Sequence, residues 1–350
     1  MTLKTFQPVL FQRKRVCDMN TIPNIQPFNE IYYKDCFYNS VISVVDHFSG
    51  SRYPILSNDI LFYRLSDSTD PCSLQIVYQD ADSLDQVLER TGLTVRTIDR
   101  CERLIDDIAA SINAGCPVVI WVDCYYESIR RDTYNKIHWG HTLLLYGIDL
   151  DNRQCAIIEH QNRMNLNYRP HIVGFDDILR PYQGYLKVFY QAKFPTFFAF
   201  SKNTDVPQLE PERWRRVERE RLIGHMHTYG SLIQQGLDDL RKAVDLTYDW
   251  YMAAGQQEIA MWIESLNKIV NGKFIERYRC KMLELGEDIL QLQQNSLEVL
   301  KKIRAVVARA YYSGNKLYDG LIFSSLHNFY ELEQQTYQKL CAVTPLTDVR

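Results

Sequence analysis

Cys36 and His141 are the two residues of this 350-residue chain whose types and positions favour nucleophilic chemistry. Cys36 opens the segment CFYNSVISVVDHF, whose apolar residues follow helical spacing, and Asp35 before it is a good N-cap residue. Backbone N–H groups and the positive end of a helix dipole favour a thiolate there. His141 begins the apolar stretch HTLLLYGI, and a histidine at the mouth of a strand is placed to exchange a proton with a thiol. The pair predicts acyl transfer through an acyl-cysteine.

A third residue is needed to orient the imidazole of His141 through a hydrogen bond. Glu159, near the end of the next apolar stretch CAIIE, is the first choice, and Asn162 is the alternative. A shift of one residue in the register of a hairpin changes which of the two shares a face with His141. Asp149 lies at the far end of its own strand, so Asp149 and Asp151 are expected to form the turn instead.

The first 200 residues alternate helical and strand-like segments, which predicts an α+β domain with an antiparallel sheet. Helices are expected at residues 35–48, 83–90 and 102–113. Strands are expected at residues 93–98, 118–123, 141–148, 155–159, 185–190 and 196–200. The polar turn DLDNR predicts that the strands before and after it form a hairpin.

The second half of the chain has a different character. The polar segment 201–211 carries two prolines and is expected to be a linker. Beyond it, stretches rich in Leu, Glu, Gln, Lys and Arg are punctuated by glycines at 255, 272 and 314, and they predict helices at 212–229, 232–253, 258–270, 274–310 and 316–340. We therefore expect domains at 1–200 and 212–350, the second an all-α helical bundle.

Composition excludes several classes of protein. Hydrophobic residues make up 46% and charged residues 24% of the chain, as in soluble globular proteins, and a net charge of -3 argues against nucleic-acid binding. No apolar run approaches the roughly 20 residues that cross a membrane. The basic cluster of the first 20 residues follows the apolar stretch, which is the wrong order for a secretory signal, and the nine cysteines are scattered and odd in number. These features predict a cytoplasmic protein with free thiols and no metal site.

Three motifs of the first 200 residues together resemble the N-terminal family of butirosin biosynthesis protein H. They are Cys36 at a helix start, AGCPVVIWVDCYY at 114–126 and GHTLLLYGID at 140–149. The resemblance implies a papain-like fold related to the C39 peptidases. It also implies an enzyme that moves an acyl group from a carrier-protein thioester to an amine of an antibiotic precursor. Cys36 would then be the acyl acceptor and His141 its base.

The chain departs from the family pattern at two places. Glu159-His160 stands where the family has Asp-Pro, so a longer carboxylate would orient the histidine. Papain-like enzymes often carry a glutamine six residues before the cysteine as an oxyanion donor, and that position is Glu30. The oxyanion hole would then depend on the backbone N–H of the cysteine and on a partner such as Asn29 or Tyr32.

The expected function is an acyltransferase of natural-product assembly. Its donor would be an acyl or peptidyl carrier protein, whose phosphopantetheine arrives with the substrate, so no bound cofactor is implied. Its acceptor would be a small molecule or a peptide, and a homo-oligomer is compatible with the sequence. The basic run ERWRRVERER at 212–221 is either a solvated helix face or a docking surface for the acidic carrier. The two rival functions are a hydrolase with the same centre and a non-catalytic papain-like binding module.

Overall fold

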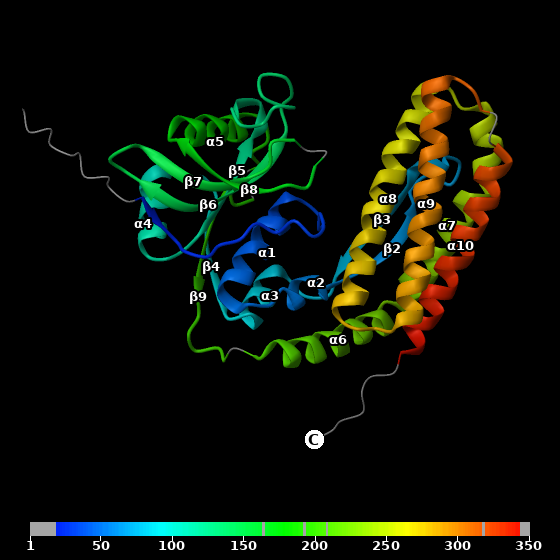
Figure 1. The fold of residues 1–350 in the computed structure, drawn as a ribbon, viewed down its shortest axis with the longest axis horizontal. Coiled ribbons are helices and arrows are strands. Elements are labelled where there is room, and N and C mark those ends of the chain that lie inside the picture. The colour runs from blue at the N-terminus through cyan, green and yellow to red at the C-terminus, as the bar shows by residue number, and fades with distance from the viewer. Residues whose placement is uncertain (1–18, 163–164, 192–193, 208, 317–318, 344–350) are drawn as a thin grey trace, which may run out of the picture.

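An antiparallel sheet and a set of long helices form two lobes in the computed structural model, which describes residues 19–162, 165–191, 194–207, 209–316 and 319–343 (Figure 1). The sheet lobe contains the sheet with helices α1 to α5, and the helical lobe contains α7 to α10, with α6 running between them. The described residues do not include segment 1–18, which contains Cys17 and on which the expectation about a secretory signal rests. They also do not include residue 208 of the predicted linker.

The sheet has seven strands, and every pairing described in it is antiparallel. Six strands follow the order β4-β9-β5-β6-β7-β8, and β1 pairs with β6. Their bounds are β1 Asn20–Thr21, β4 Leu93–Ile98, β5 Val118–Asp123, β6 Gly140–Asp149, β7 Gln154–Glu159, β8 Arg169–Gly174 and β9 Phe197–Lys202. The apolar β5 and β6 lie at the centre and are buried on both faces, as their composition predicts.

The helices of the sheet lobe pack around this sheet, and α1 lies against β5 and β6. Their bounds are α1 Cys36–Ser49, α2 Tyr53–Leu56, α3 Leu84–Arg90, α4 Leu104–Asn113 and α5 Asp176–Val188, with short 3-10 turns η1 Pro71–Ser73 and η2 Cys124–Tyr126. Asp35 and Ser83 cap α1 and α3 with their side chains, which fixes where each helix begins.

The helical lobe contains α7 Gly230–Ala253, α8 Gln256–Met282, α9 Glu287–Ser313 and α10 Asp319–Ala342, and α6 Pro211–Thr228 leads into it. A hairpin from the first half of the chain, β2 Asp59–Leu65 with β3 Leu74–Asp80, packs against α7 and α8. Residues Ile60, Tyr63 and Leu74 of this hairpin belong to the core of the helical lobe. The predicted division at 201–211 therefore does not separate the two cores, because one segment crosses it.

Most predicted elements of the sheet lobe are confirmed, and three predictions about local structure are wrong. The expected helix at 274–310 is interrupted, because α8 ends at Met282 and α9 begins at Glu287. The expected strand at 185–190 is the end of α5 and the loop after it, because Ile178 and Tyr182 form a buried helical face. The expected break at Gly272 lies inside α8, since Ile76 of β3 packs where a side chain would stand: a Cβ at Gly272 would lie 2.4 Å from it. That glycine serves a close contact between helix and strand.

The chain is α+β, with a mostly antiparallel sheet followed by a helical C-terminal region. The first two residues of the expected linker, at 201 and 202, belong to β9, and α6 begins at Pro211 as the proline suggests. Among the described residues, no helix is both long and apolar enough to span a membrane.

Candidate active site

Cys36 is the first residue of α1 and is almost fully buried, with 6% of its surface exposed. The capping residue Asp35 has an extended backbone, and its carboxylate accepts a hydrogen bond of 3.1 Å from the N–H of Tyr38. The first N–H groups of a helix have no partner within the helix. The sulfur therefore lies at the end of α1 where negative charge is favoured.

His141 lies near the start of β6, and its Nε2 atom faces the carboxylate of Glu159 at the end of β7. The distances are 2.9 Å to Oε2 and 3.1 Å to Oε1. The hairpin register accounts for this contact: Leu144 lies opposite Ile158, so Glu159 shares the face of β6 that carries His141. The structure thus brings the histidine to the first of its two predicted partners.

The remaining acidic and amide residues of this hairpin lie at its two ends. Asn162 follows β7, and its backbone carbonyl accepts a hydrogen bond of 3.1 Å from the N–H of Asn165. Asp149 closes the turn at the other end, where it accepts hydrogen bonds from the backbone N–H and the side-chain amide of Asn152, at 2.9 Å and 2.7 Å. The predicted role of Asp149 in the turn is confirmed.

Cys36 is the second group that acts on His141, because its charge favours the protonated form of the imidazole. Burial alone would lower the pKa of His141, but Glu159 and Cys36 outweigh burial and hold that pKa well above its ordinary value of 6.5. Burial likewise acts to raise the pKa of Glu159, and the charges of His141 and Arg130 outweigh it, so that pKa lies below the usual range. Thiol, imidazole and carboxylate therefore form one ordered chain.

Arg130 is a member of this site that sequence reasoning missed. Its side chain is 1% exposed, and its Nη1 atom lies 3.0 Å from Oε1 of Glu159 and 3.4 Å from Nε2 of His141. It comes from the loop between β5 and β6, which Asp123 folds by accepting a hydrogen bond of 3.2 Å from the N–H of Trp139. The polar run ESIRRD around Arg130 resembles a solvated loop, so the sequence carries no signal for its burial.

Glu127, from the same loop, is a second buried acid beside the site. Burial first, and then the negative charge of Glu159, raise the pKa of Glu127 to about 8. Both carboxylate oxygens of Glu127 are buried and have no hydrogen-bond partner among the described residues. Glu127 is therefore protonated at neutral pH, and Glu159 is the charged carboxylate of the pair.

Tyr32 is the better placed of the two predicted oxyanion donors. Burial first, and then the charge of Cys36, raises the pKa of Tyr32, so the phenol lies near the cysteine. Asn29 is instead committed to the backbone of Tyr168: its amide donates to the carbonyl at 3.0 Å, and its oxygen accepts from the N–H at 2.7 Å. The group beside the cysteine N–H is thus a phenol.

His141, Glu159 and His160 form a set of three potential metal ligands, whose ligand atoms lie within 4.8 Å of one another. The guanidinium of Arg130 already contacts Glu159 and His141 at the distances given above. A divalent cation among these atoms would meet the charge of that guanidinium at close range. The set is therefore better described as an ion-paired cluster than as a metal centre.

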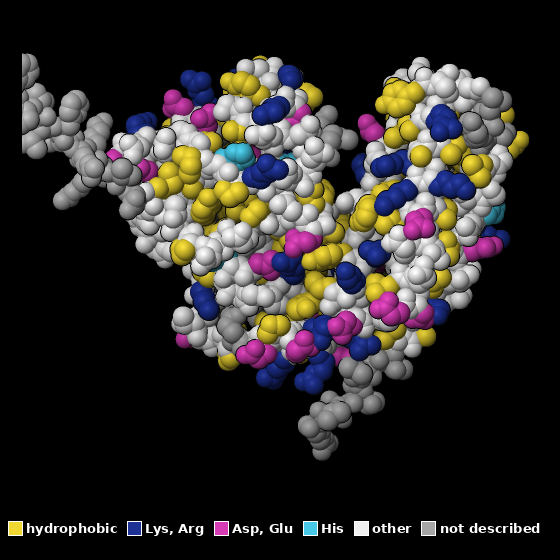
Figure 2. All heavy atoms as spheres, in the orientation of Figure 1, with side chains coloured by type: hydrophobic (Ala, Val, Ile, Leu, Met, Phe, Trp, Pro, Cys, Tyr) yellow, Lys and Arg dark blue, Asp and Glu magenta, His cyan; other side chains and the backbone are white. Residues whose placement is uncertain are grey.

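Two hollows adjoin the site. The first, here called the aromatic pocket, has a volume of about 290 Å³ and is lined by Phe37, Trp121, Tyr185, Phe189, Tyr190, Gln191, Phe194, Pro195 and Phe198. The second, the interlobe crevice, has about 390 Å³ and is lined by Glu30, Ile31, Tyr32, His160, Leu166, Asn271 and Phe274. The last two belong to α8, the helix of the bundle nearest the sheet lobe, and Figure 2 shows the molecule hollowed between the lobes.

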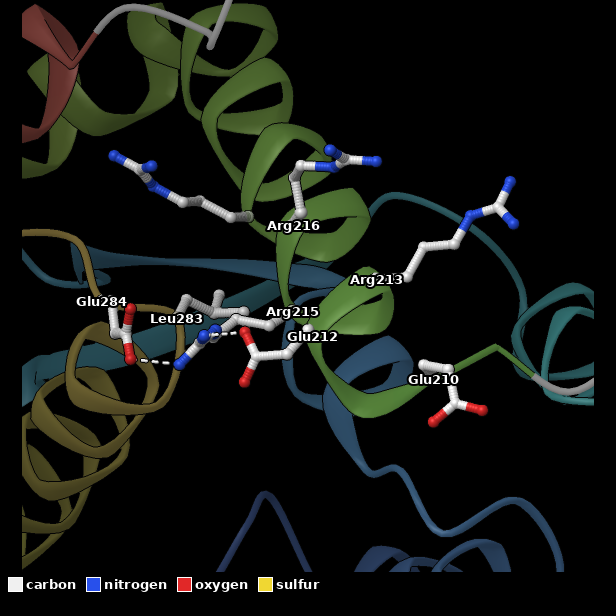
Figure 3. Close-up of a pocket in the computed structure, with 8 residues that line it drawn as sticks. Glu210, Glu212, Arg213, Arg215, Arg216, Leu283 and Glu284 are labelled. Carbon is white, nitrogen blue, oxygen red and sulfur yellow. Dashed lines mark hydrogen bonds and ion pairs between the residues drawn. The ribbon is translucent and has the colours of Figure 1, made fainter. Parts of the chain in front are cut away.

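A larger, charged hollow of about 560 Å³ lies along α6, within the predicted basic run. Arg215 points between Glu212 and Glu284 and is ion-paired with both, whereas Arg213 and Arg216 point away from these carboxylates (Figure 3). Part of the basic run is therefore neutralised within the chain, and part of it faces outward.

Comparison with known proteins identifies no relative: no protein-family model and no curated protein sequence matches the chain. The resemblance to the N-terminal family of butirosin biosynthesis protein H therefore stays a prediction from the motifs at 36, 114–126 and 140–149. Function has to be argued from the geometry of the site.

Proposed function

We propose that this chain is a cysteine-dependent acyltransferase of papain-like fold, which takes an acyl group from a carrier-protein thioester and passes it to an amine or hydroxyl. The observation that carries the proposal is the grouping of Cys36, at the start of a helix, with His141, whose Nε2 atom lies 2.9 Å from Oε2 of Glu159. A thiol, a proton shuttle and an orienting carboxylate in this order are the parts that acyl-enzyme chemistry requires.

In the first half-reaction, Sγ of Cys36 attacks the thioester carbonyl while the imidazole of His141 holds the thiol proton. The new acyl–sulfur bond forms on Cys36, and the bond between the acyl carbon and the carrier sulfur breaks. His141 gives its proton to the departing carrier thiolate. Glu159 keeps the imidazole oriented and stabilises its charge while the proton is held.

In the second half-reaction, the acceptor amine or hydroxyl attacks the acyl group on Cys36. His141 takes one proton from the attacking nitrogen or oxygen, and the acyl–sulfur bond breaks. The same proton returns to the sulfur of Cys36, which regenerates the thiol. Both half-reactions place negative charge on the carbonyl oxygen, next to the N–H of Cys36 and the hydroxyl of Tyr32.

Burial of the reacting groups supports transfer over hydrolysis. Cys36 is 6% exposed and His141 is 4% exposed, so a bound acyl group would leave little room for bulk water. The outward-facing arginines of α6 support an acidic carrier as the donor, because complementary charge speeds docking. Papain-like architecture and a carrier-protein donor both remain part of this proposal.

The test is intact-mass detection of an acyl adduct after incubation with an acyl thioester. Wild type is expected to gain one acyl group, and Cys36→Ala none, while Cys116→Ala, which removes a partly exposed cysteine, behaves as wild type. Added amine acceptors should consume the adduct and yield the amide. Free acid released at the same rate with and without amines would instead indicate a hydrolase, and no adduct on wild type would favour a non-catalytic module.

A further inference from the structure

We propose that the aromatic pocket holds the acyl group during transfer and selects a small, uncharged, apolar or aromatic acyl chain. This inference rests on the acyltransferase function proposed above, because it names the class of acyl group that Cys36 would carry. It is argued from the position of the pocket, the chemistry of its lining and its size.

The immediate chain neighbours of both reacting residues form the wall of this pocket. Phe37, which follows Cys36, is part of the lining. Gly140, which precedes His141 in β6, lies beneath two further lining rings: a Cβ at Gly140 would be 3.3 Å from the ring of Tyr185 and 3.6 Å from that of Phe189. Since successive side chains of a strand face opposite sides, the pocket lies beside the start of α1, on the face of β6 that Gly140 shares with Thr142.

Tyr185 gives a second link between the pocket and the nucleophile. Burial, and then the charge of Cys36, raise the pKa of the Tyr185 hydroxyl, so the phenol and the sulfur share one poorly solvated region. Together with Phe37 in the lining, this places the pocket next to the residue that would carry the acyl group.

The interior of the pocket is built from stacked rings. Trp121 stacks on Phe37, with ring centroids 6.2 Å apart and planes at 7°, and on Tyr185, at 5.5 Å and 24°. Phe198 packs against Phe37 with centroids 4.7 Å apart. At the rim Phe194 is 63% exposed, so its ring is accessible to a ligand that enters the pocket.

Chemistry and size then define the acyl class. Most of the described lining residues are aromatic, so an apolar or aromatic acyl group would gain extensive contact with their rings. The volume of about 290 Å³ lies at the lower end of the roughly 300–1,000 Å³ range of ligand pockets. The interlobe crevice, which carries Glu30 and His160, suits the polar parts of the substrates instead.

The first experiment compares acyl thioesters of N-acetylcysteamine that differ only in the acyl group: phenylacetyl, hexanoyl, acetyl and succinyl. Formation of the acyl adduct on Cys36 is followed by intact mass. We expect the phenylacetyl and hexanoyl thioesters to acylate Cys36 at least tenfold faster than the acetyl and succinyl thioesters. Equal rates for all four would overturn the pocket inference and leave the acyltransferase function standing.

A charge placed at the pocket lip tests the assignment of residues. Gln191 is an exposed lining residue, so Gln191→Lys should fold normally and bring a cation to the acyl group. We expect this variant to lower the ratio of the acylation rate with the phenylacetyl thioester to that with the succinyl thioester by at least tenfold. Gln154→Lys, an exposed change on β7, is the matched control and should keep the wild-type preference. An unchanged preference in Gln191→Lys would contradict the assignment.

A binding measurement separates failure of the pocket from failure of the chemistry. Cys36→Ala is titrated calorimetrically with phenylacetamide and with succinamate, neither of which can acylate a protein. If phenylacetamide binds at least tenfold more tightly than succinamate, the pocket inference is supported. This holds even if no thioester labels wild type, a result that would refute only the acyltransferase function. Equal or absent binding of the two overturns the pocket inference.

Discussion

At the scale of single residues, the site depends on one buried carboxylate that serves two cations. Glu159 contacts the imidazole of His141 at 2.9 Å and the guanidinium of Arg130 at 3.0 Å, and all three side chains are buried. Removing one partner of a buried ion pair leaves an uncompensated charge, which costs more than the pair contributes. Glu159 therefore affects both the proton shuttle and the stability of the lobe.

Glu159→Gln is expected to lower the acylation rate of Cys36 by about 10²-fold, the usual contribution of a positioned acid–base group. Without the carboxylate, burial dominates and the pKa of His141 falls, so the pH–rate profile should move toward lower pH. The measurement is the rate of adduct formation between pH 5 and 9. A lower rate with an unmoved profile would mean that Glu159 has only a structural role.

Glu127→Gln is the matched control at neutral pH, because Glu127 is already uncharged there, and it also predicts a pH dependence. The pKa of Glu127 is raised from 4.5 to about 8, so the folded state holds a proton that the unfolded state releases above pH 4.5. Stability therefore falls as pH rises from 4.5 to 8. Glu127→Gln has no carboxyl group to titrate at this position, so its stability should not fall for this reason over that pH range.

Thermal unfolding of wild type and Glu127→Gln at pH 5 and at pH 8 checks this sign. The two proteins should unfold at similar temperatures at pH 5. At pH 8 the variant should be more stable than wild type by a few kcal/mol, about 1.4 kcal/mol for each unit by which the pKa of Glu127 is raised and the pH exceeds 4.5, reduced by relaxation of the site. The same difference in stability between the two proteins at pH 5 and at pH 8 would show that Glu127 is ionised throughout.

At the scale of elements, the sequence predicted those helices and strands whose positions follow from local residue patterns. The N-cap at Asp35 placed Cys36 at a helix start, and the apolar stretches of β5, β6 and β7 fixed the face that joins His141 to Glu159. Arg130 was missed because its burial is caused by the fold of a long polar loop.

The hairpin β2–β3 was missed for a related reason. Its strands are stabilised by α7 and α8, helices that follow them in the sequence by 150 residues or more. The helix break expected at Gly272 does not occur. A glycine marks either a helix end or a close contact, and the sequence alone does not distinguish them. Tertiary contacts, rather than propensity, decided these cases.

The approach of α7 to β2 makes a testable contrast between two helical glycines. A Cβ at Gly236 would lie 2.8 Å from backbone atoms of Tyr63, which cannot move aside, whereas a Cβ at Gly224 in α6 would have nothing within 4 Å. Gly236→Ala is expected to destabilise the protein by about 1 to 3 kcal/mol through overpacking. Gly224→Ala should stabilise it by up to about 1 kcal/mol. Urea unfolding of both variants measures the difference, and equal effects would contradict the close approach.

At the scale of the whole molecule, buried charges connect the helical lobe to the start of α1, the helix that carries Cys36. Successive nitrogen–oxygen distances along this chain of ion pairs are 2.8, 2.7, 3.4, 3.1 and 2.7 Å. In order, its members are Lys34, Asp59, Arg279, Glu276, Lys273 and Glu333.

The first member of this series of ion pairs, Lys34, lies just before Cys36 in the sequence. Lys34 precedes Cys36 by two residues and has a left-handed backbone, with φ of 54°, which is unfavourable for a lysine unless its surroundings hold it. Asp59 binds its side chain and also accepts a hydrogen bond from the hydroxyl of Tyr33. The helical lobe thus helps to fix the backbone that presents Cys36.

Arg279→Met tests this connection, because Arg279 donates to both the carboxylate and the carbonyl of Asp59 at 2.7 Å. Losing one partner of a buried pair predicts a loss of about 3 kcal/mol of stability. If the helical lobe positions the catalytic helix, iodoacetamide should also label Cys36 more slowly in the folded variant than in wild type. Arg241→Met, an exposed change on α7, should alter neither quantity. Reduced stability with an unchanged labelling rate would mean that the ion pairs join the lobes without governing the nucleophile.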